Sequence, residues 1–446
     1  MLTSCRAALA AALALVLPAS ALAGGADSTF VKKGFSFGIL PAISFDSDLG
    51  FQYGVLSNLY WYGDGSRYPA YDHSLYLECS RYPAGTMLCR AYYDSPRVLN
   101  RLSERLRLTT DFTWYRDLLS DFYGFNGRKS VYNAEWADED EADDVYVSRA
   151  FYSHHKLMMR FMAGVRYDLP GDKLYAQFGV SAFNFDCGPV KRSELRHSVP
   201  DVAGLYDLYR AWGVIPESEA EGGTDVFLRL GLGVDTRDAE GFPTQGVWSE
   251  ILMALEPNSF NSNGKGFVRV TANHRQYFAL GSKDLVLAYR LTLQNRLCGH
   301  VPYYLLPHIT TNTLTSATSQ GLGGSKTNRG VKRNRIVADG IALANIELRW
   351  LIKRFELLGQ QWVIGTNVFT DWGMTTQNYD LDLTNIPDDV DQTDFFRTGN
   401  DRPHGSVGIG LKVHMNSNFI VSADYGRALS SDDGANGLYV SLNYLF

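Results

Sequence analysis

The segment Ser325–Gly340, SKTNRGVKRNRIVADG, concentrates five cations in a chain with more carboxylates than amines: Lys326, Arg329, Lys332, Arg333 and Arg335. An arginine guanidinium can hold carboxylates through charge-assisted, often bidentate hydrogen bonds. Cations that face water in a pore instead favour the passage of anions. A third use is an exposed basic loop that contacts the phosphates of lipopolysaccharide. The chemistry of this segment therefore depends on the elements that surround it.

The N-terminal residues 1–23 have the features of a secretory signal peptide. Arg6 precedes a short apolar run, and an Ala-Leu-Ala cleavage site follows at 21–23. We expect cleavage to leave a short periplasmic segment, 24–32, ahead of one membrane domain, 33–446.

Composition excludes a helical membrane protein and disfavours a nucleic-acid-binding protein. Aromatic residues make up 13% of the chain, yet the mean hydropathy is only −0.17, and no stretch after the signal approaches the roughly 18 apolar residues of a transmembrane helix. The formal net charge is −6, or −7 once Arg6 is removed. A negative chain disfavours nucleic acid as a partner.

The dominant sequence period is two, which is typical of β-strands. In QWVIGTNVFTDWG, 361–373, one face is an apolar band with a tryptophan at each end, and the other face carries Asn367 and Asp371. Ten residues at about 3.3 Å each, tilted by about 40°, rise about 25 Å. This is the height of the apolar band on a transmembrane barrel with two aromatic girdles.

Tight turns such as LPGD and LGSKD alternate with long connections at 188–223, 298–338 and 376–403. Short periplasmic turns alternating with long outer loops are typical of outer-membrane barrels, and an even strand count places both termini in the periplasm. We predict an all-β fold, a transmembrane antiparallel β-barrel of sixteen strands in the outer membrane of a Gram-negative bacterium. The predicted strands are 34–44, 49–62, 70–82, 85–94, 103–117, 151–169, 172–187, 224–238, 246–258, 264–280, 283–297, 339–356, 360–376, 404–416, 418–430 and 437–446.

The C-terminal residues GLYVSLNYLF form one predicted apolar face that ends on an aromatic side chain: Leu438, Val440, Leu442, Tyr444 and Phe446. This pattern resembles the sorting signal by which outer-membrane barrels are recognised and inserted.

Four cysteines remain after the signal peptide: Cys79, Cys89, Cys187 and Cys298. Cys79 and Cys89 flank a turn-like segment between two predicted strands in an oxidising compartment. Either they form a disulfide across the hairpin, or all four thiols are free.

Strand parity supplies partners for the basic segment. In the strands after it, Glu347 and Asp371 point to the lumen, so a loop folded inward would bring Arg329 to both carboxylates. Gly330 would let the backbone pass close to the barrel wall. The other cations, Lys326, Lys332, Arg333 and Arg335, would then line a water-filled lumen.

Several motifs resemble those of the outer membrane protein 85 superfamily, also called the bacterial surface antigen family. NRGVKRNRI at 328–336 resembles its loop-six signature, GVDTRDAEGFPTQGVW at 233–248 its strand-turn-strand signature, and NIELRW and FTDWG the next two strand motifs. The resemblance implies that Arg329 and Gly330 form the loop tip and that Glu347 and Asp371 are its wall partners. Val331 departs from the Phe or Tyr usual in the family.

The resemblance also implies a function. Such barrels insert proteins into the outer membrane or pass them across it, and the first and last strands, 34–44 and 437–446, would pair weakly and accept a client strand by β-augmentation. Family members that insert proteins usually carry polypeptide-transport-associated domains, whereas only 24–32 precedes the first predicted strand. We therefore expect a barrel-only branch with a separate periplasmic or lipoprotein partner. The alternative is a passive anion-biased channel.

No residue pattern predicts an enzyme, a cofactor or a metal site. Asp235 and Asp238 flank Arg237, which favours an ion-paired turn over acid-base catalysis. The acidic segment Glu135–Asp144 is expected to be a solvated outer loop, with divalent cations bridging it to lipopolysaccharide as the alternative. Expected partners are outer-membrane lipid, lipopolysaccharide and a client β-barrel or secreted protein.

Overall fold

The computed structural model describes residues 31–68, 70–142, 145–171, 173–311, 321–357, 359–415 and 419–446. The predicted signal peptide 1–23 and residues 24–30 of the predicted periplasmic segment lie outside the described residues.

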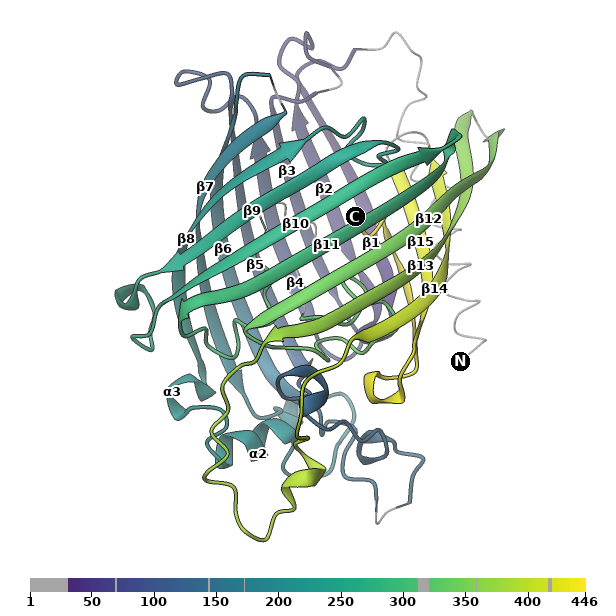
Figure 1. Cartoon of the computed structure of the whole chain (residues 1–446). Helices are drawn as coiled ribbons and strands as arrows, with labels where there is room; N and C mark the ends of the chain where they lie inside the picture. The colour runs from purple at the N-terminus through teal and green to yellow at the C-terminus, as the bar shows by residue number, and fades with distance from the viewer. Residues whose placement is uncertain are drawn as a thin grey trace.

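Within the described residues, sixteen strands form one closed antiparallel barrel, in which every strand pairs with its neighbours in sequence and β1 pairs with β16 (Figure 1). The predicted fold class and strand number are therefore confirmed. The strands are β1 Phe35–Asp46, β2 Gly50–Trp61, β3 His73–Arg81, β4 Met87–Ser95, β5 Leu106–Asp121, β6 Ser153–Asp168, β7 Leu174–Gly188, β8 Gly222–Asp235, β9 Gly246–Glu256, β10 Phe267–Leu280, β11 Ser282–Gly299, β12 Gly340–Leu357, β13 Gln360–Gln377, β14 His404–Met415, β15 Phe419–Ala428 and β16 Asn436–Leu442.

Strand β13 illustrates why these sequences form a barrel wall. Val368 and Trp372 are exposed on the outer face, while Asn367 and Asp371 are fully buried on the inner face. A wall of such strands presents an apolar surface to lipid and a polar surface to the lumen, and closure satisfies the backbone hydrogen bonds that lipid cannot. Among the described residues, no helix is long and apolar enough to cross a bilayer.

The two ends of the barrel differ. The long connections lie together at one end, which we call the loop end, with the helices α2 Leu205–Ala211 and α3 Glu217–Ala220 (Figure 1). The opposite end, with the tight turns between β10 and β11 and between β12 and β13, is the turn end. Short 3-10 helices lie at Gly127–Lys129, Glu135–Ala137, Arg192–Glu194, Asn258–Phe260, Gln392–Asp394 and Ser431–Asp433.

The largest hydrophobic core lies at the loop end, and we call it the aromatic lid. It contains buried aromatic side chains from several connections, including Phe125, Tyr209, Trp212, Tyr303 and Tyr379. The ring of Tyr209 packs against Phe122, Phe125 and Phe396 at centroid distances of 5.5, 6.2 and 5.3 Å. The long connections are thus held together as a packed cover.

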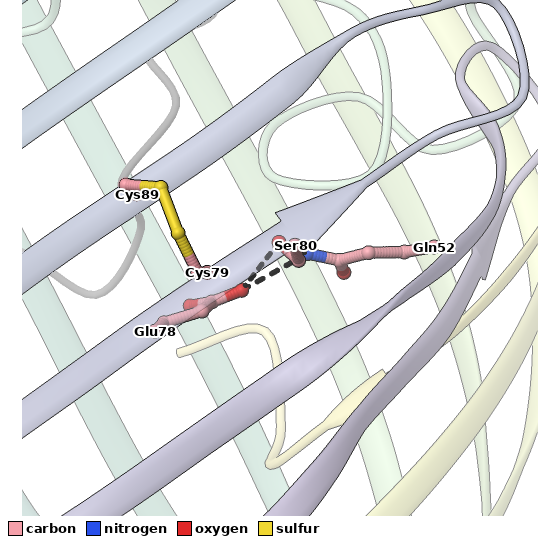
Figure 2. Close-up of a disulfide and its surroundings, with 5 residues drawn as sticks. All are labelled: Gln52, Glu78, Cys79, Ser80 and Cys89. Carbon is pink, nitrogen blue, oxygen red and sulfur yellow. Dashed lines mark hydrogen bonds between the residues drawn. A yellow bond between two sulfur atoms is a disulfide. The ribbon is translucent and has the colours of Figure 1, made fainter.

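Cys79 on β3 and Cys89 on β4 form a disulfide across the hairpin (Figure 2). Their backbones are register partners with a Cα–Cα distance of 4.3 Å. On the same strand, Glu78 and Ser80 accept hydrogen bonds from the Gln52 amide at 3.0 and 2.6 Å. Cys187 and Cys298 are free thiols, so the alternative of four free thiols does not hold.

Candidate functional site at the basic loop and the barrel seam

The basic loop, residues 321–339, is a compact hairpin ahead of β12. At its base the backbones of Leu322 and Ile336 exchange hydrogen bonds of 3.0 and 3.1 Å. Nearer the tip, the N–H of Gly324 donates to the carbonyl of Val331 at 2.8 Å. These bonds place the Arg329–Gly330 dipeptide at the tip. Val331, the residue that departs from the family pattern, is fully buried.

Arg329 contacts three carboxylates on the inner wall. Its Nε and Nη2 bind Asp371 of β13 in a bidentate manner at 2.9 and 3.1 Å, Nη2 lies 2.8 Å from Glu347 of β12, and Nη1 lies 3.3 Å from Asp424 of β15. The guanidinium also lies 3.5 Å from the centroid of the Phe369 ring. The structure thus places Arg329 against both carboxylates that parity selected, and adds Asp424.

The charge of Arg329 is secure in this setting. Burial alone would lower its pKa, but the three carboxylates raise the pKa above its usual value. A buried arginine with three charged partners fixes the loop tip, because moving it would leave Asp371 without an ion-pair partner among the described residues. Glu347 and Asp424 each have a second cation, Arg349 at 2.8 Å and Lys412 at 2.7 Å.

Gly330 occupies a position that accepts no side chain. Its φ is +92°, and a Cβ there would lie 2.6 Å from the carbonyl carbon of Gly426 and 2.7 Å from the nitrogen of Arg427 on β15. Its N–H donates to the hydroxyl of Tyr439 on β16 at 3.0 Å. The loop tip is therefore packed directly against the last two strands.

Two other cations of the loop are buried in different surroundings from those predicted. Arg333 binds Asp117 at 2.9 Å and Asp121 at 2.5 Å on β5. Arg335 donates to the backbone carbonyls of Gly127 and Ser130 at 2.9 and 3.0 Å. A role in lining a water-filled lumen does not fit these two residues, because protein groups occupy their hydrogen-bonding sites.

The two lysines of the loop are half-buried. The ammonium of Lys332 lies 5.6 Å from the centroid of the Tyr132 ring, and its backbone N–H donates to the carbonyl of Asp433 at 2.9 Å. The carbonyl of Lys326 accepts a 3.0 Å hydrogen bond from Arg290 of β11. The loop thus contacts β5 on one side of the barrel and β11 to β16 on the other.

The seam between β1 and β16 is short. Two register pairs join these strands in the described barrel, Phe45 with Val440 and Asp46 with Tyr439. Directly after β1, the N–H of Ser47 donates to the carbonyl of Leu438 at 3.1 Å, and the N–H of Leu438 donates to Oγ of Ser47 at 2.7 Å. By contrast, β1 pairs with β2 through twelve residues, including Pro41 opposite Val55. Residues 35–44 of β1 pair with β2 on one side, and no strand among the described residues pairs with them on the other side.

The C-terminal tail explains why the seam is short. Strand β16 ends at Leu442, and Asn443 takes a left-handed conformation with φ of 64°. The chain then turns away from the wall. Leu442 remains exposed on the outer face, whereas Tyr444 and Phe446 are buried.

Inside the barrel the tail contacts charged and aromatic groups. Arg349 of β12 donates to the backbone oxygen of Phe446 at 2.9 Å and lies over the rings of Tyr444 and Phe446 at 4.5 and 4.8 Å. The hydroxyl of Tyr444 hydrogen-bonds His414 at 3.1 Å. The prediction of one continuous apolar face is therefore wrong: Leu438, Val440 and Leu442 belong to the strand, but Tyr444 and Phe446 face inward. A role of these residues in sorting stays a prediction.

The acidic residues considered for chemistry lie elsewhere. Arg237 binds Asp235 at 2.7 Å, and Asp238 accepts hydrogen bonds from Thr244, so both acids stabilise the turn between β8 and β9. In the acidic segment, 138–142 is largely exposed, and residues 143–144 lie outside the described residues.

Sequence reasoning missed Asp424 and Tyr439, whereas the parity that selected Glu347 also places Arg349 on the inner face. Asp424 interrupts an apolar strand at an inward position, and this parity signal could have identified it. Tyr439 could not be identified in this way, because its role depends on the hydrogen bond with the tip of a distant loop.

Comparison with solved structures identifies the fold. The barrel superposes on the crystal structure of BamA from Haemophilus ducreyi lacking POTRA domains 1–3 with a TM-score of 0.54 and 14% identity, over 92% of this chain and 70% of that chain. CdiB from Acinetobacter baumannii gives a TM-score of 0.43 at 12% identity over 92% and 66% of the two chains. A bacterial polysaccharide outer membrane secretin gives 0.40 at 9% identity over 94% and 100%.

A search of curated proteins finds no match. The sequence model of the Omp85 superfamily domain matches residues 95–444, which is more than half of the chain. The chain therefore belongs to the Omp85 superfamily.

Proposed function

We propose that this protein assists the insertion of proteins into the bacterial outer membrane, or their passage across it, by opening between β1 and β16. Family membership supports insertion or translocation in general. The observation that carries the specific proposal is the seam, where two register pairs and the hydrogen bonds between Ser47 and Leu438 close the barrel, and residues 35–44 present an unpaired edge.

An unpaired edge in a bilayer has a strong tendency to acquire a partner. Backbone N–H and C=O groups exposed to hydrocarbon each cost several kcal/mol. A client strand laid against 35–44 would satisfy these groups by β-augmentation. The outward side chains of this edge, Phe35, Phe37 and Ile39, are already exposed and apolar, so a client hairpin would enter lipid directly.

The contacts of the basic loop favour movement on the β1 side. Tyr439 of β16 accepts a hydrogen bond from Gly330, Asp424 of β15 binds Arg329, and the tail is held by Arg349. None of these bonds reaches 35–44. Opening would then separate β1 from a braced β16, and the basic loop acts as an internal brace.

In this proposal the turn end faces the periplasm and the loop end faces the cell exterior, as short turns and long loops do in outer-membrane barrels. Clients arrive from the periplasm, delivered by a separate periplasmic or lipoprotein partner. Lipid and lipopolysaccharide surround the wall. The process makes and breaks no covalent bond, so it requires no catalytic residue.

The passive channel has less support. The aromatic lid packs across the loop end, and Arg333 and Arg335 are buried against protein groups. A path for solutes would require both the aromatic lid and the basic loop to move.

A matched pair of crosslinks tests the seam. Val440 lies between two register partners, Phe45 on β1 and Ala423 on β15. With the four native cysteines replaced, the variant Phe45→Cys/Val440→Cys locks the seam. The control variant Ala423→Cys/Val440→Cys places the same residue in a crosslink within an already paired ladder.

The expected result is that the seam crosslink abolishes client insertion, measured as the yield of newly folded barrels in cells and in proteoliposomes, and that the control crosslink does not. Reduction with dithiothreitol should restore insertion. Full insertion by the crosslinked, folded seam variant would refute lateral opening.

A further inference from the structure

Two carboxylates are buried side by side at the loop end, apart from the basic loop. Asp225 on β8 is fully buried and Glu256 at the end of β9 is 4% exposed. Both accept hydrogen bonds from the same amide nitrogen, Nδ2 of Asn261, at 2.7 and 3.0 Å. The backbones of Asp225 and Asn261 also form an isolated β-bridge, which fixes their separation.

This pair has no cationic partner. Among the described residues, no lysine or arginine forms an ion pair with either carboxylate, and the neighbouring charges that act on them are acidic: Glu219 acts on Asp225, and Asp225 acts on Glu256. Oδ2 of Asp225 and Oε1 of Glu256 are buried without a hydrogen-bond partner that meets normal geometry. Burying negative charge in this way is costly unless a cation or a proton is bound.

Neutral oxygen atoms complete the surroundings. Oδ1 of Asn261 accepts from the N–H of Asn263 at 2.7 Å, and Oγ of Ser262 accepts from the N–H of Thr224 at 2.9 Å. The hydroxyl of Tyr304 also faces Asp225, as a hydrogen-bond donor. A donor set made only of oxygen atoms suits a hard divalent cation rather than a transition metal.

We propose that Asp225, Glu256 and Asn261 form a calcium site. Metal binding would require the Asn261 side chain to turn Oδ1 from the N–H of Asn263 toward the two carboxylates, which breaks that 2.7 Å hydrogen bond and replaces a hydrogen-bond donor by a third oxygen ligand. Calcium accepts irregular sets of six to eight oxygen atoms, so water and the nearby hydroxyls can complete its shell. No group of three or more His, Cys, Asp or Glu side chains is arranged for a metal in the described chain, and this site relies on two carboxylates and neutral oxygens.

The site would add a metal link between elements that are already joined by hydrogen bonds, including one of 3.2 Å from Nδ2 of Asn263 to the hydroxyl of Tyr304. Asp225 and Glu256 belong to the barrel rim, Asn261 belongs to the turn between β9 and β10, and Tyr304 belongs to the aromatic lid. Bound calcium would fasten the aromatic lid to the rim, and chelation would loosen it.

The test uses the full chain refolded without lipopolysaccharide in detergent micelles, with terbium as the probe. Tyr304 is close enough to sensitise terbium luminescence, and calcium or magnesium is then titrated as competitor. The test variant is Asp225→Asn/Glu256→Gln. Asp284→Asn, an exposed carboxylate paired with Arg354 at the turn end, is the matched control. A second control variant neutralises Asp138, Glu139 and Asp140. It removes any terbium binding by the acidic segment from the measured signal.

We expect saturable terbium binding that calcium reverses at about millimolar concentration or below, and a higher unfolding temperature in calcium than in EDTA. The double variant should bind at least about tenfold more weakly and lose the effect of EDTA, while both control variants keep it. If the double variant does not show a folded, heat-modifiable band, Glu256→Gln alone replaces it.

Three outcomes would overturn the proposal. The first is wild-type protein with no saturable calcium response. The second is a double variant that binds terbium as well as wild type. The third is a double variant that is more stable than wild type in both calcium and EDTA, because the pair then shares a proton instead of a metal. Displacement by magnesium in preference to calcium would refute the calcium assignment.

Discussion

The backbone N–H of Gly330 donates a 3.0 Å hydrogen bond to the hydroxyl of Tyr439, and the backbone of Tyr439 is the register partner of Asp46 across the seam. One side chain thus connects the tip of the basic loop to one of the two residue pairs that close the barrel. The loop tip and β16 are therefore joined by a direct hydrogen bond.

Tyr439→Phe should loosen the last strand. The substitution leaves the buried N–H of Gly330 without an acceptor, which costs about 1–3 kcal/mol. We expect faster hydrogen exchange in Asn436–Leu442, measured by mass spectrometry, and unchanged exchange in β8. Tyr289→Phe, which removes a hydroxyl bonded to Gln276 on β10, is the control. Identical exchange of β16 in Tyr439→Phe and wild type would show that the bond does not brace the strand.

Arg329→Met should prevent stable folding of the barrel. It leaves Asp371 buried without its ion-pair partner, while Glu347 keeps Arg349 and Asp424 keeps Lys412. Removing one partner of a buried ion pair typically costs about 3–5 kcal/mol. We expect a strongly reduced fraction of heat-modifiable barrel on gels. Arg354→Met, which removes an exposed ion pair with Asp284, should fold like wild type. A normal yield of folded Arg329→Met would contradict the role of Arg329 as the anchor of the loop.

Asp48→Asn should stabilise the protein in a pH-dependent manner. Burial, with the charges of Asp46 and Asp121, raises the pKa of Asp48 from 3.8 to about 8, and its Oδ2 lacks a hydrogen-bond partner. The folded state therefore holds a proton that the unfolded state loses, so stability falls as pH rises from about 4 to about 8. The gain from Asp48→Asn should be small at pH 4 and level off above pH 8.

Thermal unfolding of both proteins from pH 4 to pH 9 measures this difference. Because Asp48 lies in the turn between β1 and β2, the titration reports on the closed seam region. A stability difference that is constant with pH would mean that Asp48 is ionised throughout.

Tyr209→Ala should open the loop end to ions. The fully buried ring contacts aromatic side chains from two other connections, and its removal creates a cavity at a cost of about 3–5 kcal/mol. We expect low conductance of the wild-type barrel in planar bilayers and more frequent, larger open events in the variant. High wild-type conductance, equal to that of the variant, would instead support the passive channel.

The sequence predicted the barrel well because its signal is local. Period-two patterning with tight turns determines where a strand can exist, and each of the sixteen strands overlaps its predicted range. Parity within strands also placed Glu347 and Asp371 on the inner wall, where Arg329 contacts them.

The inward turn of the C-terminal tail and the partners of Arg333 could not be predicted from local patterning. The turn at Asn443 depends on one left-handed residue, and asparagine adopts that conformation only where the surroundings favour it. The attraction of Arg349 for the rings of Tyr444 and Phe446 supplies those surroundings from a distant strand. Likewise, the partners of Arg333 lie more than two hundred residues upstream in sequence, on β5.

Pro41 lies within the unpaired edge of β1 and limits what can join it. Proline has no N–H, and strands tolerate it where that group would point away from the neighbouring strand. A strand added along 35–44 therefore lacks one ladder donor at Pro41. Under the proposed function, this gap would weaken the pairing of a client strand and ease its release, and it would also discourage a second copy of the barrel from pairing edge to edge in the membrane.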